Sequence, residues 1–292
     1  MDTRARLLPG VLHPARPRPP PAHEVQAFQL HRPHRLRYYQ RDGDVRHHAA
    51  SPVSGPTMTD LIPAPPVPRI PVAGGGTFPV RRIYCVGRNF ADHAREMGAN
   101  APASAAERGQ PMFFMKPADA IVTGDAPVPY PPATSDLHHE VELVVALGQD
   151  APDGVLPVDQ AMSLVLAYGV GLDLTRRDLQ AAAKAKGGPW DIAKGFDYSA
   201  PVSMLVPATQ VGELAPLELS LEVNGQTRQH STLDNMIWSV PEILHELSRL
   251  YALRAGDLVF MGTPAGVAAL RPGDRFSARL GNIARRDGMI AG

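Results

Sequence analysis

The stretch Asp136-Leu137-His138-His139-Glu140-Val141-Glu142-Leu143-Val144-Val145-Ala146-Leu147-Gly148 decides the fold, because its branched apolar residues predict a buried strand. Glu140 and Glu142 stand two residues apart in that stretch. Successive strand side chains point to opposite faces, so both carboxylates share one face, roughly 7 Å apart along the chain. Two such carboxylates repel each other and are costly to bury, and a divalent cation resolves both problems. The pattern predicts a cation site at the edge of a core.

Asp173 is the candidate third ligand. It follows a strand-like run and precedes Thr175, whose spacing to Asp178 predicts a capping box at the start of a helix. Taken alone, a carboxylate in that place is better interpreted as a helix cap or a dipole partner. Together with Glu140 and Glu142 it would complete an all-oxygen ligand set suited to Mg²⁺, Mn²⁺ or Ca²⁺.

His93 and Glu96 are the candidate acid–base pair. They stand three residues apart on a predicted helix, so their side chains can meet. A carboxylate beside an imidazole raises its basicity, which suits a general base acting on water. Spacing alone favours an ordinary surface pair. Lys116 and Lys194 lie next to apolar runs and are candidates to stabilise an oxyanion or an enolate; a solvated stem is the commoner role of a lone lysine.

Three further residues are candidates for binding a carboxylate of a substrate. Arg88 and Arg177 suit that role, or they pair with the nearby Asp92 and Asp178. Thr263 lies in a Gly-Thr-Pro turn, where it is either a turn residue or a donor of its hydroxyl and backbone N–H.

Short strands dominate the rest of the chain. Residues 217–223 alternate between apolar and polar side chains, and Asn224-Gly225 then predicts a tight hairpin. Residues 240–251 predict an amphipathic helix, and residues 258–261 another buried strand. Regular alternation of strands and helices is missing, which argues against a doubly wound sheet. We predict a β-rich mixed α+β fold.

Composition restricts the class of protein. The 292 residues carry no formal net charge, which gives no support for a nucleic-acid or anionic-membrane partner of the whole chain. Cys85 is the single cysteine, so neither an internal disulfide nor a thiolate metal cluster is expected. The sequence contains no apolar run of membrane-spanning length and no apolar signal core at its start. A cytoplasmic protein fits best.

Residues 1–57 differ from the remainder, because they are rich in proline, arginine and histidine. We predict a disordered extension, and favour translation starting at Met58, which would make the extension a start-site artefact. An arginine-rich arm that binds nucleic acid is the rival interpretation, which salt-dependent DNA binding by this segment would support. Residues 58–292 are the predicted catalytic domain.

Six segments together resemble the fumarylacetoacetate hydrolase family over about residues 58–275. Each is short, and it is their order that makes the combination specific. They are residues 84–97 (YCVGRNFADHAREM), 114–117 (FMKP), 139–143 (HEVEL), 171–180 (GLDLTRRDLQ), 189–196 (PWDIAKGF) and 256–267 (GDLVFMGTPAGV).

The resemblance implies a β-sandwich roll that dimerises, with Mg²⁺ or Mn²⁺ as cofactor and Ca²⁺ as a substitute in a crystal. It implies the following site residues: metal ligands Glu140, Glu142 and Asp173; a water-activating pair His93 and Glu96; and substrate contacts Lys116, Gln180, Lys194 and Thr263. As a mechanistic hypothesis, catalytic Lys194 would stabilise an enolate and Arg88 would contact a second carboxylate of the substrate.

Residues 79–89 most resemble the fumarylpyruvate hydrolases of this family. The implied reaction is hydrolysis of a C–C bond in a 2,4-diketo acid, yielding fumarate and pyruvate during aromatic degradation. The same site would support oxaloacetate decarboxylation or isomerisation of a 2-hydroxy-diene-dioate, and a ligand-binding protein with a silent site is the non-enzyme alternative. Near the C-terminus, Arg285-Arg286-Asp287 interrupts the apolar alternation that the family's final strand would show, which is a departure from the family pattern.

Overall fold

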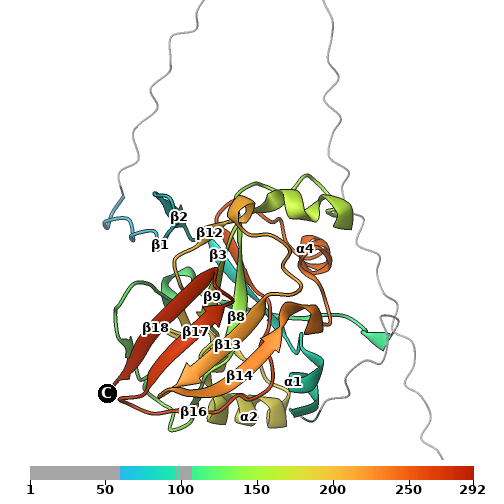
Figure 1. Cartoon of the computed structure of the whole chain (residues 1–292). Coiled ribbons are helices and arrows are strands. Elements are labelled where there is room, and N and C mark those ends of the chain that lie inside the picture. The colour runs from blue at the N-terminus through green and yellow to red at the C-terminus, as the bar shows by residue number, and fades with distance from the viewer. Residues whose placement is uncertain (1–59, 97, 99–106) are drawn as a thin grey trace, which may run out of the picture. The chain divides into compact units, whose positions relative to one another are not determined.

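The computed structural model describes residues 60–96, 98 and 107–292 (Figure 1). The extension predicted over residues 1–57, and Met58 with it, lie outside the described residues. Mixed β-sheets with few helices confirm the predicted α+β class. Within this described part, no helix has the length and hydropathy of a membrane span.

Strand β8 (Val141–Leu147) lies inside a six-stranded sheet, and all seven of its residues are buried. In order across the sheet, the strands are β12 (Val206–Pro207), β9 (Val165–Leu172), β8 (Val141–Leu147), β15 (Asp257–Phe260), β3 (Arg82–Gly87) and β4 (Met112–Lys116). β8 is antiparallel to both neighbours, whereas β15 and β3 run parallel. Leu143 and Val145 enter one apolar core and Val144 and Ala146 enter another, as the two-residue period requires.

A five-stranded sheet packs against β8 and β9 around the larger core. In order, its strands are β14 (Gln226–Thr232), β13 (Glu218–Val223), β17 (Arg275–Leu280), β18 (Ala284–Ala291) and β6 (Val128–Pro129). Leu221 of β13 and Phe276 of β17 belong to the same apolar cluster as Leu143. Figure 1 shows β13, β14, β17 and β18 side by side in front of β8 and β9. The two sheets form the predicted sandwich.

The final strand, β18, forms despite the departure from the family pattern at the C-terminal tail. The strand forms across Arg285-Arg286-Asp287 and pairs with both β17 and β6. Arg286 takes an inward-facing position, only 3% exposed, with its guanidinium 5.8 Å from the Phe276 ring and donating to the Ala126 carbonyl. An arginine whose charge is solvated by a carbonyl and a ring can thus occupy a place where only apolar residues were expected.

Three small sheets complete the strands: β10 (Thr175–Arg176) with β7 (Leu137–His138) and β16 (Ala269–Leu270), β1 (Arg69–Pro71) with β2 (Thr77–Pro79), and β11 (Ala200–Pro201) with β5 (Ile121–Val122). The single strand predicted around Glu140 is therefore split between β7 and β8. At the break, the His139 N–H turns to the Ala268 carbonyl and the Val141 N–H to the Gln229 side chain.

The helices are α1 (Ala91–Glu96), α2 (Arg177–Lys186), α3 (Asp191–Lys194) and α4 (Val240–Ser248). α4 has the expected proline in its first turn and a capping box made by Ser239 and Glu242. The capping box predicted for α2 is wrong. Thr175 lies in β10 instead, and no side chain caps the helix, which begins one residue after Arg176. The Asn224-Gly225 hairpin is confirmed, with φ of 51° and 74°.

Candidate active site

Three buried carboxylates meet where β8 begins and β9 ends. Glu140 directly precedes β8, Glu142 is its second residue, and Asp173 directly follows β9. Antiparallel pairing of the two strands brings these positions together, and the Asp173 N–H donates to the Glu140 carbonyl at 2.8 Å. One oxygen from each carboxylate lies within 4.8 Å of the others, and the three residues are 5%, 1% and 0% exposed. The structure thus brings the predicted ligand set together.

Lys194 binds this carboxylate cluster (Glu140, Glu142 and Asp173) from α3. Its ammonium donates to Glu140 Oε2 at 2.8 Å, to Asp173 Oδ2 at 2.6 Å and to Thr175 Oγ1 at 2.7 Å. These three bonds use all three N–H groups of the lysine. They also explain why Thr175 does not cap α2, because its hydroxyl is engaged at the cluster.

Two further cations flank the cluster. Arg177 donates to Glu140 Oε1 at 2.8 Å, rather than to Asp178, and to Gln180 Oε1 at 2.7 Å. Lys116 Nζ lies 2.8 Å from Asp173 Oδ1 and donates to the carbonyls of Leu174 and Lys194. Three carboxylates therefore face three cations, so their formal charges sum to zero.

The electrostatics of the two glutamates differ. Burial by itself would raise the pKa of Glu140, but Lys194 and Arg177 outweigh it and hold the pKa below its ordinary value. Burial raises the pKa of Glu142, and Asp173 and Glu140 raise it further, against Lys194 and the Gly262 N–H that donates to Glu142 Oε2 at 2.7 Å. A cation placed beside Glu142 would relieve this repulsion.

The residues present fit a divalent metal ion. The ligand atoms are all carboxylate oxygens, which hard cations prefer. Asp173 Oδ1 is buried and has one close partner among the described residues, the Lys116 ammonium at 2.8 Å, which leaves a second lone pair of that oxygen for an ion. A divalent ion held by Glu140, Glu142 and Asp173 would give the neutral group of charges a net charge of +2, which suits an anionic substrate.

His93 and Glu96 form the second chemical unit, on α1. His93 Nδ1 lies 3.2 Å from Glu96 Oε2, and the Gly266 N–H donates to both oxygens of Glu96, at 3.1 and 3.2 Å. Burial lowers the pKa of the His93 imidazole, although Glu140 and Glu96 oppose that shift. The imidazole is therefore neutral at neutral pH, the state in which it can accept a proton.

Gln229 holds the Thr263 turn and was not predicted from the sequence. This buried side chain of β14 donates to Thr263 Oγ1 at 2.7 Å and to the Pro264 carbonyl at 2.8 Å, and its oxygen lies 2.9 Å from His139 Nδ1. Because Thr263 accepts from Gln229, its own O–H is free to donate elsewhere. No signal in the sequence marks this glutamine, since its strand neighbours are polar and exposed.

One pocket collects most of the predicted site residues. Seven of the ten line it, namely Arg88, His93, Glu140, Glu142, Gln180, Lys194 and Thr263. Asp173 and Lys116 lie beneath it, with side chains 0% exposed, and Glu96 stands behind His93. Arg177, Lys184, Phe114 and Trp190, which were not on that predicted set, also line the pocket.

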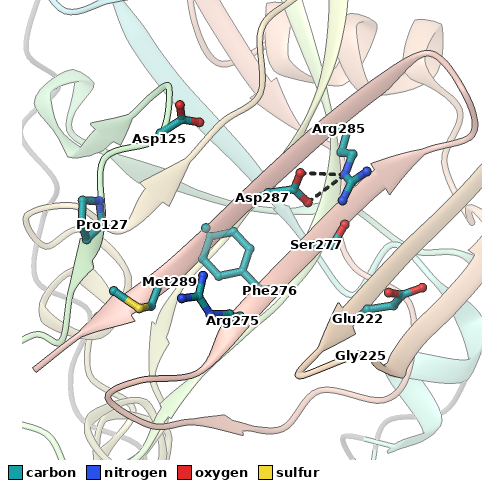
Figure 2. Close-up of a pocket in the computed structure, with 11 residues that line it drawn as sticks. Asp125, Pro127, Glu222, Gly225, Arg275, Phe276, Ser277, Arg285, Asp287 and Met289 are labelled. Atoms are coloured by element: carbon teal, nitrogen blue, oxygen red, sulfur yellow. Dashed lines mark hydrogen bonds and ion pairs between the residues drawn. The ribbon is translucent and has the colours of Figure 1, made fainter.

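A larger hollow of about 440 Å³ lies elsewhere, on the solvent-facing side of β17 and β18 (Figure 2). Figure 2 shows Arg285 and Asp287 side by side at its wall, and they form an ion pair of 2.7 Å. Both side chains are more than half exposed, and none of the clustered carboxylates lines this hollow. The reactive groups therefore belong to the smaller pocket.

Comparison with known proteins gives relatives whose names state different activities. The crystal structure of fumarylpyruvate hydrolase from Pseudomonas aeruginosa in complex with Mn²⁺ and pyruvate is 44% identical, covers 80% of this chain and 99% of that one, and superposes with a TM-score of 0.75. The mitochondrial oxaloacetate decarboxylase of Dictyostelium discoideum is 39% identical over 66% of this chain and 85% of that protein. A mitochondrial oxaloacetate tautomerase of Arabidopsis thaliana is 39% identical over 68% of this chain and 86% of that protein.

The family follows from the extent of the match as well as from the site. The fumarylacetoacetate hydrolase C-terminal domain matches residues 82–289, a range that begins with β3, ends in β18 and includes every residue of the carboxylate cluster. The chain belongs to the fumarylacetoacetate hydrolase family.

Proposed function

We propose that the protein hydrolyses the C–C bond of an acylpyruvate, a 2,4-diketo acid, in a reaction that depends on Mg²⁺ or Mn²⁺. Fumarylpyruvate is the proposed substrate, with fumarate and pyruvate as products. The observation that carries the proposal is one pocket lined by Glu140, Glu142 and the neutral His93 imidazole, with Asp173 of the carboxylate cluster beneath it. The 44% identity to a fumarylpyruvate hydrolase in complex with Mn²⁺ and pyruvate supports this substrate.

Glu140, Glu142 and Asp173 would hold the metal ion, which would act as a Lewis acid on the oxygens of the 2-oxo acid. His93 carries its proton on Nδ1, where Glu96 accepts the hydrogen bond, and so leaves Nε2 free to take a proton from water. The water oxygen bonds to the C4 carbonyl carbon. The C3–C4 bond then breaks, its electron pair stays on C3 as the pyruvate enolate, and the proton that His93 took from water is given to C3, which completes pyruvate.

The remaining predicted residues have proposed roles around the substrate. Thr263 donates its free hydroxyl to the carboxylate of the pyruvate half, and Gln180, oriented by Arg177, contacts the same half. Lys194 stabilises the enolate by shifting one N–H from a carboxylate to the developing charge. Lys116, engaged with Asp173 and two carbonyls, acts on the substrate through Asp173 rather than by direct contact.

Decarboxylation or tautomerisation of oxaloacetate is the second candidate function, because relatives with those names are 39% identical to this chain. Neither reaction needs a hydrolytic water. The His93–Glu96 pair, whose chemistry suits the activation of water, favours hydrolysis.

The test is a side-by-side assay of fumarylpyruvate, acetylpyruvate and oxaloacetate with Mn²⁺-loaded full-length protein. We expect the enol absorbance of fumarylpyruvate to disappear, with one fumarate and one pyruvate released per molecule. Turnover of oxaloacetate alone, without fumarate from fumarylpyruvate, would overturn the hydrolase proposal in favour of the second candidate. Failure of Mn²⁺ or Mg²⁺ to stimulate any of the three reactions would remove both.

The predicted homodimer, cytoplasmic location and 1–57/58–292 division stay predictions. Sedimentation of the full chain tests the first. N-terminal sequencing of protein from its native cells tests whether translation starts at Met58.

A further inference from the structure

The mouth of the active-site pocket carries two cations that the mechanism does not use. Arg88 follows β3, and Lys184 stands in the last turn of α2. Both line the same pocket as Glu140 and His93, yet both residues are exposed to solvent at its rim. The pocket therefore has a carboxylate-rich inner end and a cationic outer end.

These two rim cations lack a carboxylate partner in the described part of the chain. Neither side chain makes an ion pair or a hydrogen bond there, whereas Lys194, Lys116 and Arg177 deeper in the site each pair with a carboxylate. The cations also act on one another: burial, Arg177 and Arg88 together lower the pKa of Lys184. An anionic group bound at the rim would remove this repulsion.

The backbone at Arg88 has an uncommon conformation. Its φ of 59° lies in the left-handed region, which non-glycine residues rarely adopt and which marks positions held by their surroundings. The next residue, the fully buried Asn89, fixes the turn. Its side chain donates to the carbonyls of Met261 and Trp238 and accepts from the Trp238 N–H.

An aromatic wall joins the two ends of the pocket. The Lys184 ammonium lies 5.1 Å from the centre of the Trp190 ring, and Trp190 packs at 6.1 Å against Phe114. The Phe114 ring in turn lies 4.9 Å from the Lys194 ammonium. A flat, unsaturated chain could lie along these rings with a charged group at each end.

We propose that Arg88 and Lys184 form a clamp for a second carboxylate at the far end of the substrate, so that the enzyme selects dicarboxylic acylpyruvates over monocarboxylic ones. The inference rests on the proposed acylpyruvate chemistry and specifies its substrate class. Lys184 is a specificity residue that the sequence did not indicate, and it stands at the exposed rim of the pocket, whereas the carboxylate cluster is buried.

The test compares fumarylpyruvate, which carries the second carboxylate, with acetylpyruvate, which does not. The measured quantity is the ratio of their kcat/KM values with Mn²⁺-loaded full-length protein. Lys184→Met keeps the aliphatic stem and removes the charge. Arg88→Asn keeps a residue that tolerates the left-handed backbone. Lys186→Met, on the same helix but outside the pocket lining, is the matched control.

We expect each rim variant to lower the ratio about tenfold, mainly through KM for fumarylpyruvate, as loss of a charge-assisted contact predicts. The Lys186→Met control should leave the ratio unchanged. An unchanged ratio in both rim variants, or an equal fall in the control, would overturn the clamp.

Failure of the proposed function is a separate outcome, seen when the wild-type protein releases pyruvate from neither compound. The clamp is then tested by calorimetric binding of fumarate and of crotonate, its monocarboxylic counterpart, to the same proteins. Tighter binding of fumarate that Lys184→Met abolishes supports the clamp, and equal binding of the two acids contradicts it.

Discussion

Two hollows of this molecule contain arginines beside carboxylates, and they differ in what surrounds the charges. In the hollow on β17 and β18, Arg285 and Asp287 pair in solvent, with side chains 54% and 53% exposed. In the active-site pocket, Glu142 and Asp173 are 1% and 0% exposed and face ammonium groups that are buried as well. Water screens the first pair, whereas the second group of charges has only its neighbours and a bound cation to balance it.

The size of a hollow therefore does not identify the reactive site. The outer hollow is the larger of the two, yet its charges gain little from each other. In the active-site pocket three carboxylates are buried, and the cost of burying them falls only when cations are fixed beside them. The fixed charges therefore produce a stronger electric field there than in the outer hollow.

The largest effect should come from removing one carboxylate of the cluster. Asp173→Asn keeps the shape but removes a charge and a metal oxygen, so we expect kcat/KM to fall at least about a thousandfold, as several kcal/mol of lost metal-ion stabilisation predicts. Mn²⁺ affinity, measured by calorimetry, should fall with it. Asp287→Asn in the outer hollow is the matched control, with activity within twofold of wild type. Equal activity of the two variants would contradict the contrast between the hollows.

The next effect should come from the imidazole. His93→Gln removes the proton acceptor without touching the carboxylate cluster, and general-base losses of about a hundredfold or more in kcat are expected. Mn²⁺ binding should stay at the wild-type value, which separates the base from the metal ligands. A variant that hydrolyses fumarylpyruvate at the wild-type rate would remove His93 from the mechanism.

A smaller effect is expected at the loop that holds Glu96. A Cβ on Gly266 would lie 2.1 Å from the Arg228 carbonyl oxygen, so Gly266→Ala must displace the N–H that donates to Glu96. We expect kcat to fall about tenfold, the effect of losing an outer partner of a reactive group. Gly273→Ala is the control, because its φ of 92° resembles the 98° of Gly266 but a Cβ there meets open space. If both variants lose activity equally, backbone strain and not the Glu96 contact is the cause.

The pH dependence of kcat/KM should reflect the burial of the His93 imidazole. Protonated His93 cannot accept a proton, so activity is lost as pH falls through its pKa. Because burial lowers that pKa, the acid limb of kcat/KM should have its midpoint below the ordinary value of 6.5. The Glu96→Gln variant removes a group that raises the pKa and should move the limb further toward acid. A midpoint above 6.5 in the wild-type profile would show that the imidazole is not in the buried state described.

The smallest effect belongs to the surface pair. Asp287→Asn breaks an ion pair that is more than half exposed, and we expect the free energy of unfolding to change by at most about 1 kcal/mol. Urea denaturation measures it. A loss of several kcal/mol would mean that the outer hollow is as strongly coupled to the fold as the inner one.

The carboxylate cluster could be predicted in part from sequence, for a physical reason. Strand periodicity already placed Glu140 and Glu142 on one face, although β8 begins only at Val141. Asp173 could be interpreted as a helix cap just as well, because its meeting with the glutamates depends on the register between β8 and β9. Pairing register is a property of the fold, so ordered family motifs, and not spacing, pointed to the third ligand.

Other features could not be predicted because their partners are remote in sequence. The Thr175 capping box failed since Lys194, nineteen residues further on, binds that hydroxyl. The final strand, β18, could not be predicted from the apolar pattern, because that pattern does not indicate a buried Arg286. Gln229 and Lys184 look like ordinary surface residues until β14 and α2 are placed beside the pocket.

The central claim is that Glu140, Glu142 and Asp173 hold the metal ion on which the chemistry depends. Anomalous diffraction from crystals of the full chain grown with Mn²⁺ and pyruvate tests it most directly. We expect one strong manganese peak between oxygens of these three carboxylates, with pyruvate beside it. A peak elsewhere, or a cluster that binds no manganese while the enzyme is active, would contradict it.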